Sequence, residues 1–258
     1  MDTKLKAFER LLNVMDELRE KCPWDREQTF ESLRNNTIEE TYELADAIIT
    51  NDMSEIKKEL GDLLLHIVFY SKIASEMQAF NIADVANSLC DKLIYRHPHV
   101  FGNIDVDGAR EVEQNWEALK LKEKGRKNSV LEGVPVSLPA IVKAYRIQEK
   151  ASAVGFDWDK KEQVWEKVKE EIDELQTEII NNEMINIESE FGDLLFSLIN
   201  MARLYKIDPE AALERTNLKF IERFNYIENQ TIKQGVNLKD ITLDEMDKFW
   251  NEAKKLSE

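Results

Sequence analysis

The sequence predicts an all-α protein that contains two tandem copies of one helical domain. The chain has only 8 glycines and 5 prolines among its 258 residues, while 43% of the residues are hydrophobic and 33% are charged. A composition so poor in helix breakers and so rich in Glu, Lys, Leu and Ala favours helices. One acidic motif also occurs twice with the same internal spacing, which indicates a repeated structure.

The repeated motif is a run of glutamates followed, on the next expected helix, by an acid pair. The first copy consists of Glu39–Glu43 and Glu59–Asp62, and the second of Glu170–Glu174 and Glu190–Asp193. Matching acids lie 131 residues apart in both parts of the motif, from position 40 to 171 and from position 59 to 190. A spacing kept this strictly means that the acids hold fixed places in the two copies.

The first half of the chain is expected to hold five helices. Apolar residues with helical spacing begin at Leu5, and Pro23 ends this pattern because proline disfavours helix at the residue before it. Asn51-Asp52 supplies the turn between the two acidic helices, and His97–Gly102 is expected to be a loop. The helices are predicted at Lys4–Glu20, Thr29–Thr50, Ser54–Glu76, Ile82–Arg96 and Ala109–Lys124.

The second half is expected to follow a linker. Residues 125–139 concentrate Gly, Pro and Ser, so we place the first domain at 1–124 and the second at 140–258. Gly155–Asp159 is predicted to be a loop, Pro209 suits a first helical turn, and Thr242 is a plausible N-cap. The helices are predicted at Ala140–Ala153, Lys161–Asn181, Met184–Tyr205, Pro209–Gln234 and Leu243–Leu256.

Charge and cysteine content argue against several classes of function. The 35 Lys and Arg against 51 Asp and Glu give a net charge of −16, which disfavours binding to nucleic acids or anionic membranes. Cys22 and Cys90 form no CxxC motif, so neither a disulfide framework nor a zinc site is expected, and the cytoplasm is the natural location. We expect no signal peptide and no membrane span, because no apolar run approaches the roughly 18 residues that a span needs.

The acids share helix faces in a way that predicts a metal site. Residues three and four apart lie on one face, so Glu39, Glu40 and Glu43 form one group and Glu59 and Asp62 a second. Two such helices packed antiparallel would direct about five carboxylates at one point, which is costly unless a metal ion lies among them.

A solvated helix face is the ordinary explanation for a single acidic pair, but two observations argue against it. Gly61 and Gly192 lie inside apolar helices, where glycine costs about 1 kcal/mol relative to alanine. Tyr42 and Asp173, which point off the acidic face, differ between the copies while the acids do not. The acids are therefore matched only where a metal site needs them.

The types of ligand indicate which metal is expected. An all-carboxylate set favours Mg²⁺, with Mn²⁺ as a second possibility. A ferritin-like di-iron site would need Glu-x-x-His on two helices, and neither copy has it. His66 follows Asp62 by one turn, but its counterpart is Phe196, so we interpret His66 as a core histidine.

Basic and aromatic residues are repeated as well. Lys and Arg four residues apart share a helix face and could bind phosphate oxygens, although surface charge is the ordinary alternative. Each Trp, with a Lys one turn later, could lie against a base or ribose, or could belong to the core. Acids, metal and cations without a nucleophile set suggest that water attacks phosphorus. The pairs are Lys92 and Arg96, Lys219 and Arg223, Trp116 and Lys120, and Trp250 and Lys254.

These motifs resemble the MazG family of all-α nucleoside triphosphate pyrophosphohydrolases. EExxE followed by ELGD or EFGD is the family signature, and the two-domain form is matched along essentially the whole chain by CPWDREQTFESL, EETYELADAI, ELGDLLLHIVFYSKIA, RHPHVFG, VGFDWD and EFGDLLFSLINMAR. The resemblance implies Mg²⁺-dependent cleavage of NTPs, and of dNTPs, between the α- and β-phosphates. It also implies homodimers in which paired helices complete a four-helix active core.

The resemblance also implies roles for particular residues. In the second copy Glu171, Glu174, Glu190 and Asp193 would hold the metal, and in the first copy Glu40, Glu43, Glu59 and Asp62. Glu170 and Glu39 would orient or deprotonate the attacking water. Lys219, Arg223 and Lys254 would contact the triphosphate and Trp250 the nucleoside, with Lys92, Arg96, Lys120 and Trp116 as their counterparts.

The chain departs from the family pattern at one position in each copy. Lys58 and Ser189 stand where the family often has a further Glu, so no extra ligand is expected there. The family suggests that the second domain is the main catalyst, although the first lacks no ligand. Two other hypotheses remain open: a helical regulatory or nucleotide-sensing protein, and a phosphohydrolase acting on another pyrophosphate. The sequence identifies no residues that would read the base.

Overall fold

The computed structural model describes residues 2–108, 111–112, 115–116, 119–120 and 129–256. This part of the chain is helical and contains no strand, which confirms the all-α fold class. The chain divides into two compact units, Met1–Lys120 and Leu121–Glu258, each carrying one copy of the acidic motif. The expected domain limits at 124 and 140, and the linker at 125–139, stay predictions because residues 121–128 lie outside the described residues.

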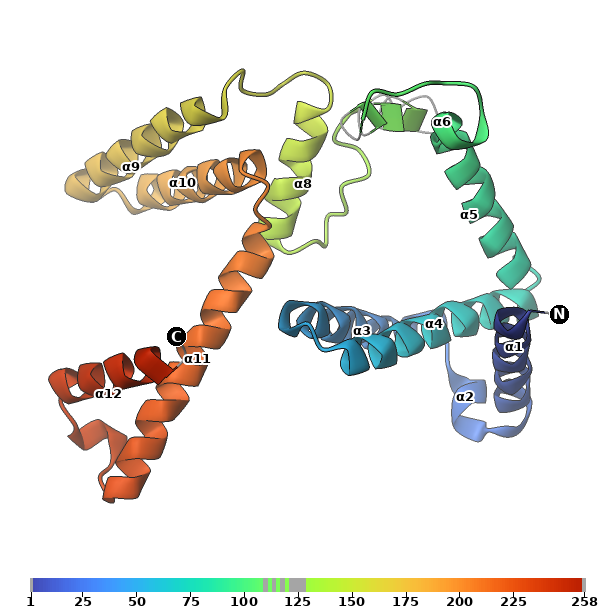
Figure 1. The fold of residues 1–258 in the computed structure, drawn as a ribbon, viewed down its shortest axis with the longest axis horizontal. Coiled ribbons are helices and arrows are strands. Elements are labelled where there is room, and N and C mark those ends of the chain that lie inside the picture. The colour runs from blue at the N-terminus through green and yellow to red at the C-terminus, as the bar shows by residue number, and fades with distance from the viewer. Residues whose placement is uncertain (1, 109–110, 113–114, 117–118, 121–128, 257–258) are drawn as a thin grey trace. The chain divides into compact units, whose positions relative to one another are not determined.

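The first unit begins with helices whose ends follow from local signals. Asp2 caps the first helix, and Thr29 caps the third through a capping box with Ser32. Asn51 ends the third helix in the left-handed conformation (φ 56°), and Asp52 caps the fourth. The helices are α1 (Thr3–Lys21), α2 (Pro23–Glu27), α3 (Phe30–Thr50), α4 (Met53–Glu76), α5 (Ile82–Arg96) and α6 (Pro98–Phe101) (Figure 1).

The core of the first unit joins α1 to the antiparallel hairpin of α3 and α4 (Figure 1). Its buried side chains come from all three helices and leave the acidic ends of the hairpin outside the cluster. They are Met15, Leu33, Val68, Phe69 and Ile73. The apolar run of α4 that follows Asp62 therefore anchors the hairpin, while its first turns carry the acids.

The second unit repeats the acidic hairpin. Asn182 ends one acidic helix in the left-handed conformation (φ 60°), as Asn51 does in the first unit. Pro209 lies in a first helical turn and Thr242 forms a capping interaction with Glu245, which confirms both assignments. The elements are α8 (Ala140–Ser152), the 3₁₀ turn η1 (Lys161–Gln163), α9 (Val164–Asn181), α10 (Met184–Leu204), α11 (Pro209–Gln234), the 3₁₀ turn η2 (Leu238–Asp240) and α12 (Leu243–Leu256).

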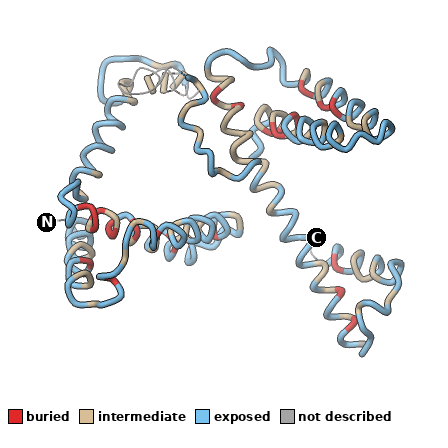
Figure 2. Tube along the Cα trace, turned by 180° about the vertical axis from the view of Figure 1, so that it is seen from behind, coloured by how far each residue is buried: buried red, intermediate tan, exposed pale blue. Residues whose placement is uncertain are grey.

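Packing in the second unit is pairwise. Helix α9 packs along α10, α8 contacts α10 and α11, and α12 packs on α11. Buried positions are few and scattered along these helices (Figure 2). Large apolar side chains at the turn of the acidic hairpin remain exposed, among them Ile180 (83%), Met184 (73%) and Ile185 (84%). The hairpin thus presents an apolar surface that its own unit does not cover.

The structure differs from the predicted elements at a few points. Pro23 and Pro98 each occupy the first turn of a short helix, so α2 and α6 stand where a break and a loop were expected. The helix expected at 161 begins as a 3₁₀ turn. Residues 111–112, 115–116 and 119–120 are helical, while the rest of the helix expected at 109–124 lies outside the described residues.

Candidate metal centre

The first acidic cluster lies between α3 and α4. Glu40 and Glu43 are three residues apart and therefore share a face of α3, and the turn at Asn51 brings Glu59 of α4 opposite them. One carboxylate oxygen from each of these three residues lies within 4.8 Å of the other two. This spacing would let one cation contact all three side chains.

The second unit repeats this cluster at the corresponding positions. Glu171 and Glu174 of α9 and Glu190 of α10 each place one oxygen within 4.8 Å of the others. Glu171 is buried and Glu174 exposed. The repeated sequence motif thus corresponds to a repeated three-dimensional arrangement of three glutamates.

Crowding of the acids changes their proton affinity. Burial, together with the charges of Asp62 and Glu43, raises the pKa of Glu40. Partial desolvation of the carboxyl group and the charge of Glu171 likewise raise the pKa of Glu174, although the residue as a whole is exposed. Each cluster therefore favours the binding of positive charge, either as protons or as a metal ion.

Glu59 is the most buried acid of the first cluster, with 2% of its surface exposed. A hydrogen bond from Lys58 lowers the pKa of its carboxyl group. Its Oε1 lies 2.8 Å from the Lys58 ammonium, while its Oε2 has no hydrogen-bond partner in the described part of the chain. A buried carboxylate oxygen without a partner is costly, so this atom favours an additional ligand in the cluster.

Two lysines that the sequence analysis did not assign to the site contact the clusters. Lys58 pairs with Glu59, and Lys167 lies 2.8 Å from Glu171 and 2.9 Å from Glu170. Helical spacing could have revealed Lys167, because it precedes the two acids by three and four residues. Lys58 directly precedes Glu59 in sequence, and such neighbours do not normally face each other on a helix.

These clusters fit a hard divalent cation. All donors are carboxylate oxygens, as Mg²⁺ prefers, and Glu59 of the first cluster also has a buried oxygen that finds no hydrogen-bond partner among the described residues. The remaining predicted acids lie outside the three-residue groups, and their roles stay predictions. Of these, Asp62 is half-buried and acts on Glu40 through its charge, Glu170 pairs with Lys167, and Glu39 and Asp193 are exposed.

The predicted arginines and tryptophans meet in both units. The Arg223 guanidinium lies 5.4 Å from the ring centroid of Trp250, and Arg96 lies 5.2 Å from that of Trp116. Phe220 packs beside Trp250, whereas His97 takes the edge of Trp116. Such cation–π contacts hold the arginine in place. Arg223 Nε is buried without a hydrogen-bond partner among the described residues, which suits an anionic ligand.

The lysines predicted to bind substrate differ in how far they are exposed. Lys92, Lys219 and Lys254 are exposed, and Lys120 is half-buried. Their contact with a triphosphate stays a prediction.

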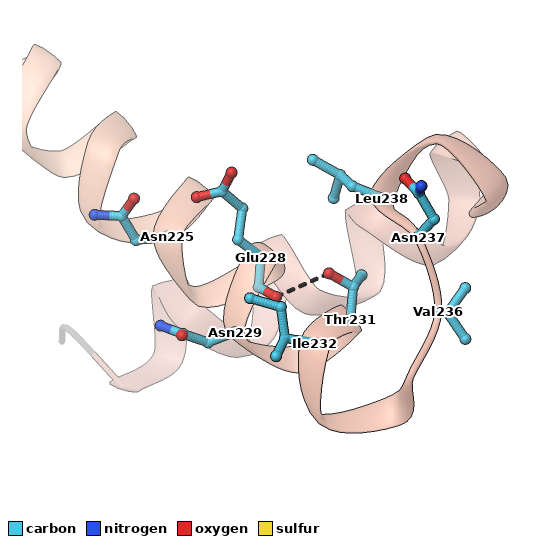
Figure 3. Close-up of a pocket in the computed structure, with 8 residues that line it drawn as sticks. All are labelled: Asn225, Glu228, Asn229, Thr231, Ile232, Val236, Asn237 and Leu238. Carbon is cyan, nitrogen blue, oxygen red and sulfur yellow. Dashed lines mark hydrogen bonds between the residues drawn. The ribbon is translucent and has the colours of Figure 1, made fainter.

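A hollow of about 540 Å³ lies elsewhere, at the end of α11 and beside η2 (Figure 3). It is lined by Asn225, Glu228, Asn229, Thr231, Ile232, Val236, Asn237 and Leu238. Thr231 donates a hydrogen bond to the backbone carbonyl of Glu228 (Figure 3). None of the predicted site residues lines this hollow, so its volume does not locate the chemistry.

His66 is a core histidine, as expected. It is 7% exposed, and its Nδ1 lies 3.2 Å from the Thr37 hydroxyl, which in turn lies 2.6 Å from the Tyr70 hydroxyl. Burial lowers the pKa of His66, although the charge of Asp62 opposes this effect. The corresponding residue in the second unit is Phe196, so this polar network belongs to the first unit.

The fold and the site together define a class: a tandem all-α protein in which each unit carries a three-carboxylate cluster and an Arg–Trp pair. The model of the MazG nucleotide pyrophosphohydrolase domain matches the chain twice, at residues 28–101 and 160–227. These two segments contain both acidic clusters. The chain belongs to the MazG family.

Relatives match over nearly the whole chain. A Thermotoga maritima protein named nucleoside triphosphate pyrophosphohydrolase/pyrophosphatase MazG is 46% identical over 96% of this chain and 95% of its own length. The nucleoside triphosphate pyrophosphohydrolase of Escherichia coli K12 is 39% identical over 97% of this chain and 98% of its own length. The Bacillus subtilis protein YabN is 44% identical over 96% of this chain, which spans 52% of YabN.

Proposed function

We propose that the protein hydrolyses nucleoside triphosphates, NTPs and dNTPs, to nucleoside monophosphates and pyrophosphate with Mg²⁺ as cofactor. The three-carboxylate cluster, built twice from the same positions, is the observation that carries this proposal. The activity named for the full-length relatives supports it. Removal of unwanted nucleotides in the cytoplasm is the role we infer, and the net charge of −16 gives no reason to expect a nucleic-acid partner.

The acids would hold the metal. In the second unit the ligands would be Glu171, Glu174 and Glu190, joined by Asp193; in the first unit they would be Glu40, Glu43 and Glu59, joined by Asp62. When bound, Mg²⁺ or Mn²⁺ supplies positive charge that neutralises the phosphate oxygens. The buried position of Glu171 and Glu59 fixes one ligand of each cluster in place.

The cations and tryptophans would bind the nucleotide. Arg223 presents a planar donor group to phosphate oxygens, and Trp250, held beneath it, offers its ring to the nucleoside. Lys219 and Lys254 would complete the triphosphate contacts. The counterparts in the first unit are Arg96, Trp116, Lys92 and Lys120.

The reaction would proceed by attack of water on the α-phosphorus. The new bond joins the water oxygen to that phosphorus, the bond to the bridging oxygen breaks, and pyrophosphate leaves. Glu170, or Glu39 in the first unit, would orient the water and accept its proton. Glu170 currently pairs with Lys167, so it would have to exchange this partner for the water.

A homodimer would complete a four-helix core around the acids. Two observations support this arrangement. At Gly61 and Gly192 an added Cβ would meet no described atom within 4 Å apart from the neighbouring residues and backbone of its own helix, so the glycines do not serve packing inside the unit. The apolar side chains of Ile180 and Ile185 at the second acidic hairpin are more than four-fifths exposed, and a second copy of the hairpin would bury them.

The proposal is tested by incubating the full chain with Mg²⁺ and a panel of NTPs and dNTPs. Pyrophosphate and the monophosphate are expected, and release of orthophosphate instead would refute the assigned cleavage position. Glu174→Gln and Glu43→Gln then test the two clusters separately. If only one cluster turns over substrate, the variant of that cluster is expected to lose about 100-fold or more of the activity, since even indirect disturbance of metal ligands costs 10–100-fold. If both clusters turn over substrate, each variant keeps the activity of the intact cluster. Full activity in both variants would exclude both clusters from catalysis.

A further inference from the structure

Lys58 has two carboxylates within reach beside the first cluster. Its ammonium lies 2.8 Å from Glu59 Oε1 and 3.5 Å from Glu55 Oε2. Glu59 belongs to the cluster, whereas Glu55 lies one turn earlier on α4 and outside it. The Lys58 side chain is 59% exposed, so the ammonium can move from one acid to the other without leaving solvent.

The burial of the Glu59 carboxylate explains why a positive charge is needed beside the first cluster. Its carboxylate is almost fully buried, and Oε2 has no hydrogen-bond partner among the described residues. A buried charge is stable only when it is paired. Because the same side chain contributes an oxygen within 4.8 Å of those of Glu40 and Glu43, the partnerless oxygen is a sign, independent of the acid count, that the cluster takes a cation.

We infer that Lys58 is a displaceable counter-ion of the first cluster. It pairs with Glu59 when no divalent cation is bound and turns to Glu55 when one binds. The inference rests on the metal-binding function proposed above. Lys58 therefore lowers the affinity of the cluster for the metal, and Glu55 partly restores it by offering the displaced ammonium a partner.

The second cluster has a comparable arrangement built from another position. Lys167 comes from α9 rather than from α10, and it too is shared between an acid inside the cluster, Glu171, and one outside it, Glu170. In each unit one lysine thus pairs with an acid of the cluster. The two lysines are not equivalent in the repeat, since position 58 corresponds to Ser189. A lysine with one partner inside and one outside is the shared feature.

The test measures binding of Mn²⁺ to the full chain by EPR spectroscopy of the free ion. All proteins carry Glu171→Gln and Glu174→Gln, so that the first cluster reports alone. Lys58→Gln is expected to tighten binding about fivefold, the size of a favourable exposed ion pair. Glu55→Gln is expected to weaken binding about twofold, and to have no effect once Lys58 is Gln.

Lys57→Gln is the matched control, because it removes the same charge from the exposed neighbouring position. It is expected to leave the Kd unchanged, and circular dichroism checks that all variants keep their helices. The inference is overturned if Lys58→Gln does not tighten binding, if Lys57→Gln has the same effect, or if Glu55→Gln acts equally with and without Lys58. If neither the parent nor Lys58→Gln binds Mn²⁺, the proposed metal function of this cluster fails, and the inference fails with it.

Discussion

The guanidinium of Arg223 lies over the ring of Trp250, 5.4 Å from its centroid. The contact joins α11 to α12, which pack on each other and carry the buried residues Ile227 and Ala253. Arg96 and Trp116 repeat it at 5.2 Å in the first unit. Stacking on a tryptophan orients the guanidinium without using its N–H groups, and an oriented planar guanidinium is the form in which arginine recognises phosphate.

Replacement of Arg223 by Lys is expected to raise the KM for an NTP about tenfold and to change kcat less. Lysine keeps the charge but loses the planar donor group and the stacking on Trp250. Steady-state kinetics with pyrophosphate detection measure both constants. Arg215→Lys, at an exposed position on the same helix, is the control and should behave as wild type. An unchanged KM in Arg223→Lys would remove this residue from substrate binding.

The acidic clusters are expected to make thermal stability depend on Mg²⁺ and pH. Saturating Mg²⁺ should raise the Tm by a few degrees, because it binds the folded clusters only. The pKa of Glu174 is raised from its usual 4.5 by partial desolvation of the carboxyl group and by the charge of Glu171, so protons compete with the metal at a higher pH than at an ordinary glutamate. The Mg²⁺-induced rise in Tm, followed by calorimetry, should therefore shrink as the pH falls towards that raised value.

Without metal the same pKa shift has the opposite effect on stability. The folded chain holds the Glu174 proton more tightly than the unfolded chain, so the stabilisation is present at low pH and is lost as the pH rises through the raised pKa. Glu174→Gln should thus be at least as stable as wild type at pH 7 without Mg²⁺. A lower Tm of this variant under these conditions would contradict the electrostatic crowding of the cluster.

Gly192→Ala is expected not to lower the thermal stability, so that any loss of activity has another cause. Within the described residues an added Cβ at this position meets no atom within 4 Å, and alanine favours helix by about 1 kcal/mol, so the Tm should not fall. If a second copy of the hairpin approaches Gly192, activity and dimer content should both decrease, whereas approach of the substrate alone should lower the activity and leave the dimer content unchanged. Ultracentrifugation and pyrophosphate release measure the two effects. Full activity and an unchanged assembly would show that nothing approaches this glycine closely.

The buried His66 is expected to make the first unit sensitive to acid. Because burial lowers its pKa below the usual 6.5, the unfolded chain binds the proton first, and stability falls as the pH decreases through that value. His66→Phe, which copies Phe196 of the second unit, should remove this contribution and make the Tm fall less steeply as the pH decreases below 6.5. Equal pH profiles for wild type and variant would show that His66 does not titrate differently on folding.

The sequence predicts the helices well because their ends carry local signals. Thr29, Asp52 and Thr242 cap helices where the pattern places a start. The same reasoning missed the short helices after Cys22 and His97, since a proline that ends one helix also suits the first turn of the next. Helical periodicity does not distinguish a loop from a single turn of helix.

The site was predictable only in part. The matched spacing identified Glu40, Glu43 and Glu59 and their counterparts, because helix faces and a hairpin turn suffice to bring them together. The ion pair between Lys58 and Glu59 could not be predicted from the sequence, because adjacent residues point to different faces of a helix. Residue spacing predicts the helix face on which a residue lies, but it does not predict how a long side chain extends from that face.

The left-handed asparagines at positions 51 and 182 have a consequence for how these hairpins tolerate change in length. Each holds the chain reversal to a fixed number of residues, with φ of 56° and 60°. Removal of one residue from either reversal would turn the following helix by about 100° and shift it by about 1.5 Å. Glu59 or Glu190 would then point away from the acids of the preceding helix, although every acid would still be present in the sequence. The number of residues in the reversal therefore determines whether the acids of the two helices face each other. A shortened loop would abolish the acidic cluster as completely as the loss of a ligand.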